Sequence, residues 1–107
     1  MDQTILNNLE IELRRGTQTL AVLSLLKEKQ YGYSLLQALE EKHVYIEAGT
    51  LYPMLRRLET QGLLVSNWDT QESRPRKYYE LSTDGQAALD KLIEVYRDMT
   101  KHFSSLL

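Results

Sequence analysis

The segment over residues 47–81, EAGTLYPMLRRLETQGLLVSNWDTQESRPRKYYEL, constrains the fold more than any other part of this chain. Leucines at helical spacing in its first half predict a helix over about 47–61 with one buried face. Gly62 follows where helices commonly end in a left-handed residue. Pro53 lacks the N–H that would pair with the carbonyl of Gly49, but so near the helix start the cost is small enough for the helix to persist with some bending.

Two short runs after this helix, over 63–68 and 76–81, predict strands because they are rich in Val, Trp, Tyr and Leu. The residues between them, 69–75, are polar and end in proline, as expected of an exposed hairpin tip. A shorter apolar helix is predicted over 34–42. A helix followed at once by a basic-tipped hairpin is the layout of a winged helix-turn-helix, in which the helix enters a DNA groove and the hairpin grips the adjacent backbone.

The first third of the chain is predicted to be helical with one break. Apolar residues at helical spacing predict a helix over 2–14, Gly16 interrupts it, and residues 17–29 form a very apolar helix at the centre of the domain. Residues 30–33 are predicted to form a turn in which Gly32 is free to take a positive φ.

The last segment predicts one long helix with an apolar seam. Thr83 is placed to be its N-cap, with Gln86 as the partner in a capping box. Apolar residues then recur at alternating spacings of three and four, the heptad pattern of a coiled-coil seam. About 24 residues of helix extend roughly 36 Å, farther than so small a body can cover. The seam and its flank are formed by Leu89, Leu92, Ile93, Tyr96, Met99, Phe103 and Leu106.

This seam has two possible partners: the N-terminal helix of the same subunit, or the equivalent helix of a second copy. The length of the helix favours the second copy, and a chain this short gains useful burial from a partner. The N-terminal helix would then close the homodimer interface from the side. Its contributing residues are Ile5, Leu6, Leu9 and Leu13. The expected fold is mainly α (α+β), with a winged helix-turn-helix DNA-binding domain over 1–81, which includes the N-terminal helix 2–14, and a dimerisation helix over 82–107.

The net charge of −2 does not by itself indicate a nucleic-acid-binding protein. Its distribution is more informative, because residues 50–79 contain five basic and three acidic side chains, whereas residues 80–107 contain three basic and five acidic ones. The positive charge is gathered on the predicted helix and hairpin. Non-specific affinity for DNA is still expected to be modest, because few phosphates would be neutralised.

Several classes of protein are not supported by the sequence. The chain has no cysteine, which excludes disulfides and thiolate metal sites and fits a cytoplasmic location. No signal peptide and no apolar stretch near the roughly 20 residues that span a bilayer are recognisable, so no membrane partner is expected. His43 and His102 lack ligand spacing, and no phosphate-binding loop or nucleophile motif is present. We therefore expect no metal, no cofactor and no enzymatic activity.

Four stretches of the sequence together resemble the PadR family of bacterial and archaeal transcription regulators. They are RRGTQTLAVLSLL, YGYSLLQALEEK, EAGTLYPMLRRLETQGLL and RPRKYYELSTDG, within about residues 13–89, and their combination at this separation is highly specific. The single C-terminal helix resembles the smaller PadR subfamily. The chain departs from the family at QESRP in the hairpin tip, where glycines are frequent.

The resemblance implies a homodimeric winged-helix repressor that binds a roughly palindromic operator in double-stranded DNA. It also implies release by a small molecule in some members, including phenolic compounds and planar hydrophobic drugs. If the helices of two subunits cross, an apolar slot for such an effector is expected around Tyr96, Met99 and Phe103, with Trp68 as a further aromatic; the alternative is a filled seam.

The side chains predicted to contact DNA lie on the 47–61 helix, at the start of the 34–42 helix and on the hairpin. The helix arginines would otherwise form a solvated face with pairs to residues such as Glu59, Tyr52 would otherwise belong to the core, and Pro53 would otherwise only shape the helix. Tyr33 and Ser34 would otherwise form a turn or cap the helix, and the hairpin cations would otherwise solubilise a loop. The rival function is a winged-helix protein-interaction module that does not bind DNA. The DNA-contact candidates are Tyr33, Ser34, Thr50, Tyr52, Pro53, Arg56, Arg57, Arg74, Arg76 and Lys77.

Overall fold

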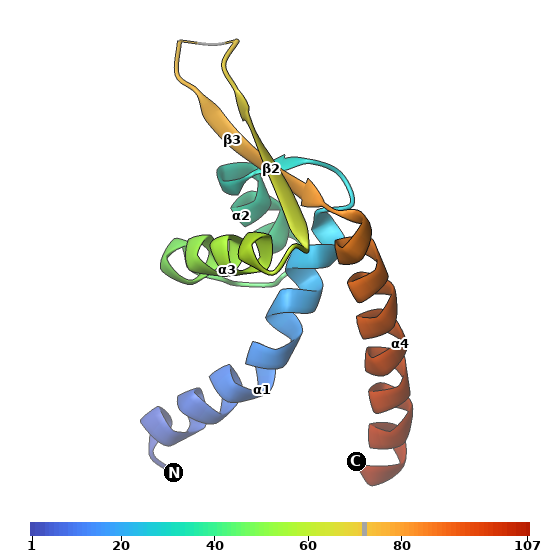
Figure 1. Ribbon diagram of the computed structural model, residues 1–107. Coiled ribbons are helices and arrows are strands. Elements are labelled where there is room, and N and C mark those ends of the chain that lie inside the picture. The colour runs from blue at the N-terminus through green and yellow to red at the C-terminus, as the bar shows by residue number, and fades with distance from the viewer. Residues whose placement is uncertain (72) are drawn as a thin grey trace.

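The computed structural model describes residues 1–71 and 73–107, which form four helices and one three-stranded antiparallel sheet (Figure 1). This confirms the predicted winged helix-turn-helix fold. Glu72, in the predicted hairpin tip, lies outside the described residues. The elements in chain order are α1 (Gln3–Leu25), β1 (Gln30–Tyr31), α2 (Gly32–Glu41), α3 (Ala48–Thr60), β2 (Leu64–Asp69), β3 (Arg76–Leu81) and α4 (Thr83–Leu106).

Helix α1 runs without interruption through Gly16, so the predicted break between two N-terminal helices is wrong. Asp2 caps the helix by accepting a hydrogen bond of 2.8 Å from the backbone N–H of Thr4. A glycine inside a helix costs only about 0.5–1 kcal/mol relative to alanine, too little to end a helix whose last turns are held in the core. Val22 and Leu23 provide that anchorage, since both are fully buried.

The predicted turn over 30–33 is also different in the structure. Gln30 and Tyr31 form the short strand β1, which pairs with β3, and Gly32 is the first residue of α2. Positive φ angles among the described residues belong to His43 and Gly62, not to Gly32. Gly62 has φ +81° and ends α3 as predicted.

The sheet has the order β1-β3-β2, so the hairpin β2–β3 is extended at one edge by β1. The hairpin register runs from Leu64 opposite Leu81 to Asp69 opposite Arg76. In Figure 1 the hairpin, called the wing from here on, projects away from the helices at the end opposite the chain termini.

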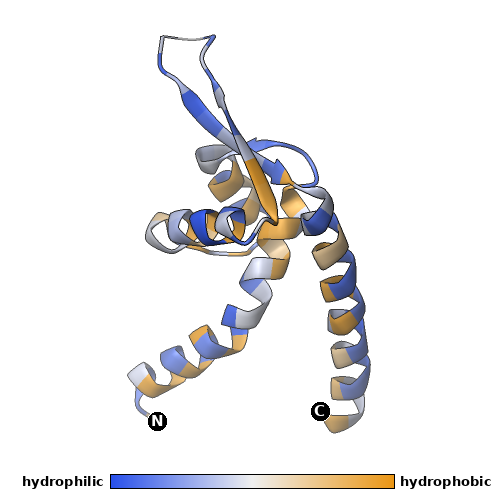
Figure 2. Ribbon diagram, viewed as in Figure 1, coloured by the Kyte–Doolittle hydropathy of each residue, from blue (hydrophilic) through white to orange (hydrophobic). Residues whose placement is uncertain are grey.

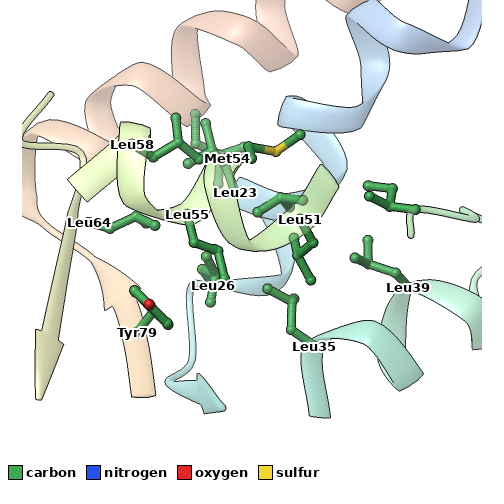
Figure 3. Close-up of a cluster of buried hydrophobic side chains, with 13 residues drawn as sticks. Leu23, Leu26, Leu35, Leu39, Leu51, Met54, Leu55, Leu58, Leu64 and Tyr79 are labelled. Carbon is green, nitrogen blue, oxygen red and sulfur yellow. The ribbon is translucent and has the colours of Figure 1, made fainter. Parts of the chain in front are cut away.

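The hydrophobic core lies where α1, α2 and α3 meet the base of the sheet and the start of α4 (Figure 3). Every helix contributes a face, and the sheet contributes Leu64 and Tyr79. This arrangement fixes α3 against the base of the wing. The fully buried side chains are Val22, Leu23, Leu26, Leu35, Leu39, Leu51, Leu55 and Leu89.

The N-cap of α4 is Ser82, not Thr83 as predicted. The Ser82 hydroxyl accepts a hydrogen bond of 3.0 Å from the Gly85 N–H and donates one of 2.6 Å to the carbonyl of Gly62. Gly85 lies directly against the carbonyl of Leu63, where a side chain would not fit. The start of α4 is therefore fastened to the residues that follow α3.

Beyond the core, α1 and α4 separate toward their free ends (Figure 1). The radius of gyration is 15.9 Å, larger than the roughly 13 Å expected of a compact domain of this length. The protruding helices and the wing account for the difference, and they leave apolar surface uncovered.

Candidate nucleic-acid interface

Helix α3 turns one face to the core and the other to solvent. Leu51, Met54, Leu55 and Leu58 are buried, which is the helical stripe that the sequence predicts. The opposite side of the helix is exposed and carries the predicted contact residues. They are Thr50, Tyr52, Pro53, Arg56 and Arg57.

Pro53 lies inside α3, and the helix continues past it to Thr60, as the sequence predicts. Thr50, Pro53 and Arg57 follow the spacing that places residues on one side of a helix. Arg56 is also exposed. A hydroxyl, a flat apolar ring and two guanidinium groups are therefore presented along the solvent face of α3, a set that suits phosphates and base edges.

Tyr52 has a structural contact that the sequence leaves open. Its ring packs against the backbone of Gly32, so it joins α3 to the start of α2, and 36% of the residue stays accessible. Tyr33, which follows Gly32 in the sequence, is exposed, and its hydroxyl accepts a hydrogen bond of 3.3 Å from the Gln37 amide. Tyr52 thus aligns the two helices of the helix-turn-helix.

Ser34 is engaged within the start of α2. Its hydroxyl lies 2.8 Å from Oε1 of Gln30, to which it donates, and 3.0 Å from the carbonyl oxygen of Tyr31. These contacts hold the β1–α2 junction, although the start of α2 has no side-chain N-cap hydrogen bond.

The three wing cations do not form one open cluster. Arg74 is exposed in the loop between the strands. The Arg76 guanidinium lies over the ring of Tyr31, 5.3 Å from its centre. The Lys77 ammonium lies 3.4 Å from Oε1 of Glu59, on α3. Lys77 is therefore turned toward α3.

Glu59 is a functional candidate that the sequence alone does not indicate, because there it is only a neighbour of the α3 arginines. Its Oε2 accepts a hydrogen bond from the Ser66 hydroxyl of β2, while Oε1 faces Lys77 of β3. The hydrogen bond from Ser66 lowers the pKa of the Glu59 carboxyl, partial burial opposes this, and the charge of Lys77 lowers the pKa further. No local sequence signal reports such a contact, because it depends on how the sheet docks on α3.

Asp69 links the face of the wing opposite Lys77 to Tyr31 of β1. The Tyr31 hydroxyl donates a hydrogen bond of 2.9 Å to its Oδ2, and the backbone N–H of Gln71 donates one of 3.1 Å to its Oδ1. The Gln71 N–H and then the Tyr31 hydroxyl lower the pKa of the Asp69 carboxyl. An open cavity of about 490 Å³ lies beside these residues. It is lined by Lys29, Tyr31, Trp68, Asp69, Thr70, Gln71 and Tyr78.

The residues predicted to form the dimer seam are mostly exposed. Figure 2 shows apolar positions recurring along the free parts of α1 and α4. Leu89 is an exception and a correction: it is fully buried in the core of its own subunit, because the first turns of α4 pack on the body, so it is not available to a partner. Ile93 is partly buried against the core. The predicted seam residues that are exposed are Ile5, Leu6, Leu9 and Leu13 on α1, and Leu92, Tyr96, Met99, Phe103 and Leu106 on α4.

The predicted effector residues Tyr96, Met99 and Phe103 lie together along α4, whereas Trp68 lies on β2 of the wing. The wing and the free end of α4 extend in opposite directions (Figure 1), so Trp68 does not join this group within one subunit.

The structure also bears on membrane-spanning helices and on metal sites. In the part of the chain that the structure describes, no helix is long and apolar enough to cross a membrane. Among the same residues, no group of three or more His, Cys, Asp or Glu is arranged to hold a metal ion. His43 lies 3.4 Å from the Tyr45 hydroxyl, and His102 lies 3.5 Å from Asp98.

The helix pair α2–α3, the wing β2–β3 and the long helix α4 define a winged helix-turn-helix protein. Residues 22–91 match the PadR-like family of transcriptional regulators. The chain is 37% identical over 79 residues to Transcriptional regulator Rv3488 of Mycobacterium tuberculosis, which covers 73% of this chain and 74% of that protein. The chain therefore belongs to the PadR-like family of transcriptional regulators, which confirms the resemblance drawn from its motifs.

Solved structures of PadR family proteins are also similar to this chain. A PadR family transcriptional regulator from Eggerthella lenta is 43% identical, with a TM-score of 0.89, over 96% of this chain and 92% of that one. Bacillus subtilis PadR in complex with operator DNA is 24% identical, with a TM-score of 0.64, over 69% of this chain and 45% of that one. The second likeness concerns the fold.

Proposed function

We propose that this chain is a homodimeric, sequence-specific DNA-binding regulator that represses transcription from a roughly palindromic operator. The observation that carries the proposal is the solvent face of α3, where Thr50, Pro53, Arg56 and Arg57 stand exposed beside the wing. In winged helix-turn-helix proteins this helix enters the major groove. The Bacillus subtilis relative described above was solved with operator DNA, which supports the same use of the fold here.

A homodimer is proposed because both free helices expose apolar side chains. Phe103 of α4 is 46% exposed and Ile5 of α1 is 54% exposed, values unsuited to a surface that stays in water. A second copy would cover both helices at once and place two recognition helices about one turn of DNA apart, or somewhat more. The wings would hold the flanking phosphates and set the register.

We also propose release from DNA by a small hydrophobic or aromatic effector that binds at the seam of α4. Tyr96, Met99 and Phe103 lie at successive seam positions of α4. A flat ligand between two such helices would change the distance between the recognition helices. Operator affinity would then fall through the dimer geometry and not through competition at α3.

The test is retention of genomic DNA. Fragments of the source genome retained by the purified chain are sequenced, and affinity for the enriched duplex is measured at several salt concentrations. We expect log K to fall linearly with log salt, because phosphate contacts release counterions. The variant Arg57→Ala with Arg74→Ala should weaken binding and flatten the slope, whereas Arg97→Ala, an exposed arginine on α4, should leave both unchanged.

The rival function, a protein-interaction module without DNA binding, makes the opposite prediction. It requires that no genomic duplex be enriched and that residual DNA affinity be insensitive to loss of Arg57 and Arg74. Either result in a folded, dimeric preparation would remove α3 and the wing from consideration as a DNA-binding surface.

A further inference from the structure

The last turn of α3 carries a carboxylate that reaches both strands of the wing. Oε2 of Glu59 accepts the hydrogen bond of the Ser66 hydroxyl, and Oε1 lies 3.4 Å from Nζ of Lys77. Ser66 pairs across the hairpin with Tyr79, so Lys77, two residues from Tyr79, lies on the same face of the sheet. One side chain of the recognition helix is thus bound to both strands of the wing at neighbouring positions.

This contact spans the joint between the two elements. Between α3 and β2 the chain passes through Gly62, which adopts φ +81°. Leu64 anchors the start of β2 in the core, whereas Asn67 and Trp68 beyond Ser66 are exposed. Glu59 therefore contacts the wing near the point where the wing stops packing on the helical core.

The stability of the protein does not account for this arrangement. The side chains of Glu59 and Lys77 are 33% and 31% exposed, and pairs that retain contact with water contribute little to folding. The acidic group also opposes DNA binding, because it neutralises one of the few cations of the wing. Because the Glu59 carboxylate adds little stability and reduces the positive charge, we look for its role in the orientation of the wing relative to α3.

We propose that Glu59 is a positioning residue that fixes the angle of the wing to the recognition helix, so that both elements fit one DNA duplex together. This inference rests on the DNA-binding function proposed above. It assigns Glu59 to specificity and not to affinity. Tyr31, which holds Asp69 on the opposite face, limits how far the wing moves when the Glu59 contact is lost.

Charge and orientation predict different outcomes for Glu59→Gln. The substitution frees Lys77, so affinity for any duplex should rise if charge alone matters. If orientation matters, the affinity for the selected duplex falls relative to the affinity for a scrambled duplex of the same length. The quantity measured is the ratio of these two affinities, selected over scrambled. We expect this ratio to fall by about five- to tenfold, within the range of one ordinary intramolecular hydrogen bond.

Three further variants separate the causes. Ser66→Ala removes the hydrogen bond without changing charge, and Glu59→Asp keeps the charge but shortens the reach; both should lower the ratio by roughly threefold without raising affinity for scrambled DNA. Glu80→Gln on β3 is the matched control, since it removes the same charge, and by strand alternation Glu80 lies on the opposite face from Lys77. It should leave the ratio unchanged.

Trp68 supplies a readout that does not need DNA. It is the single tryptophan and lies on β2, two residues beyond Ser66. In the proposed dimer of this chain, the fluorescence anisotropy of Trp68 should fall in Glu59→Gln and Ser66→Ala and stay at the wild-type value in Glu80→Gln, while the melting temperature changes little.

The outcomes are distinct. An unchanged ratio in Glu59→Gln, with equal gains for selected and scrambled duplexes, overturns the positioning role, and so does an unchanged Trp68 anisotropy. If the wild-type chain enriches no duplex, the DNA-binding function fails, and the anisotropy alone then decides whether Glu59 restrains the wing.

Discussion

The ring of Tyr52 occupies the space in which a side chain at position 32 would have to lie. A Cβ added to Gly32 would be 2.8 Å from the Tyr52 hydroxyl oxygen and 2.9 Å from its Cζ. Glycine at the first position of α2 is thus required by packing and not by backbone conformation. The pair sets how α2 and α3 approach each other.

Gly32→Ala is therefore expected to destabilise the protein by about 1–3 kcal/mol, the usual cost of forcing a group into a filled site. The Tyr52 ring would have to move out, which also changes the surface offered to DNA. Urea denaturation followed by circular dichroism measures the loss. Wild-type stability in this variant would mean that Tyr52 rotates away freely and does not align the two helices.

Gly16→Ala is the matched substitution with the opposite sign. Gly16 lies inside α1, and a Cβ added there meets nothing within 4 Å. Because alanine is the better helix former, we expect a gain of about 0.5–1 kcal/mol in the same denaturation experiment. A loss of stability would show that Gly16 lies against a neighbour, most simply the second subunit.

The two glycines also show what the sequence can predict here. Helices α2 and α3, the hairpin and the stop at Gly62 follow from local periodicity and turn residues, and the structure confirms them. Glycine alone does not reveal whether it breaks a helix, frees a backbone angle or makes room for a distant ring. The predictions of a helix break at Gly16 and of a positive φ at Gly32 are wrong for this reason.

Long-range contacts explain the remaining differences. The two-residue strand β1 is too short to have a periodicity and exists because β3 pairs with it. Leu89 continues the heptad spacing of α4, but spacing does not indicate where a helix leaves the body of the protein. Glu59 is linked to Ser66 and Lys77 only through the docking of the sheet on α3, which no local pattern encodes.

The dimer seam is tested by charge. Leu92→Glu with Met99→Glu places two carboxylates on the exposed apolar stripe of α4, where burial against a second copy would be costly. We expect monomers in sedimentation velocity. Lys101→Glu, on the polar side of the same helix, should remain dimeric. A dimer that persists in the double variant would place the interface elsewhere.

The contact of Glu59 should also be visible in the pH dependence of stability. A carboxyl whose folded-state pKa is lowered contributes stability above its unfolded pKa, about 4.3, and that contribution is lost as the pH falls through the folded-state value. The hydrogen bond from Ser66 is the main cause of the lowering. Wild type should exceed Glu59→Gln in free energy of unfolding at neutral pH, by no more than about 1 kcal/mol.

This difference should disappear in acid, because a protonated glutamate resembles glutamine in shape and charge. Urea denaturation of both proteins at neutral pH and at about pH 3, below the ordinary glutamate value, measures it. A difference that stays constant across this range would assign the effect of the substitution to packing and not to the charge of Glu59.

An effector that enters between the α4 helices is expected to leave the emission of Trp68 unchanged, since Trp68 lies on the wing and Phe103 lies near the far end of α4 (Figure 1). A reporter at the seam is needed, and Tyr96→Trp in a Trp68→Phe background supplies one with similar size and an aromatic face. Titration with flat aromatic compounds should then give a saturable change in emission and, at the same concentrations, weaker binding to the selected duplex. Lys101→Trp in the same background controls for adsorption to the outside of the helix. Equal responses from the two reporters would mean that the compounds coat the surface, and the seam would then be a filled interface without a ligand site.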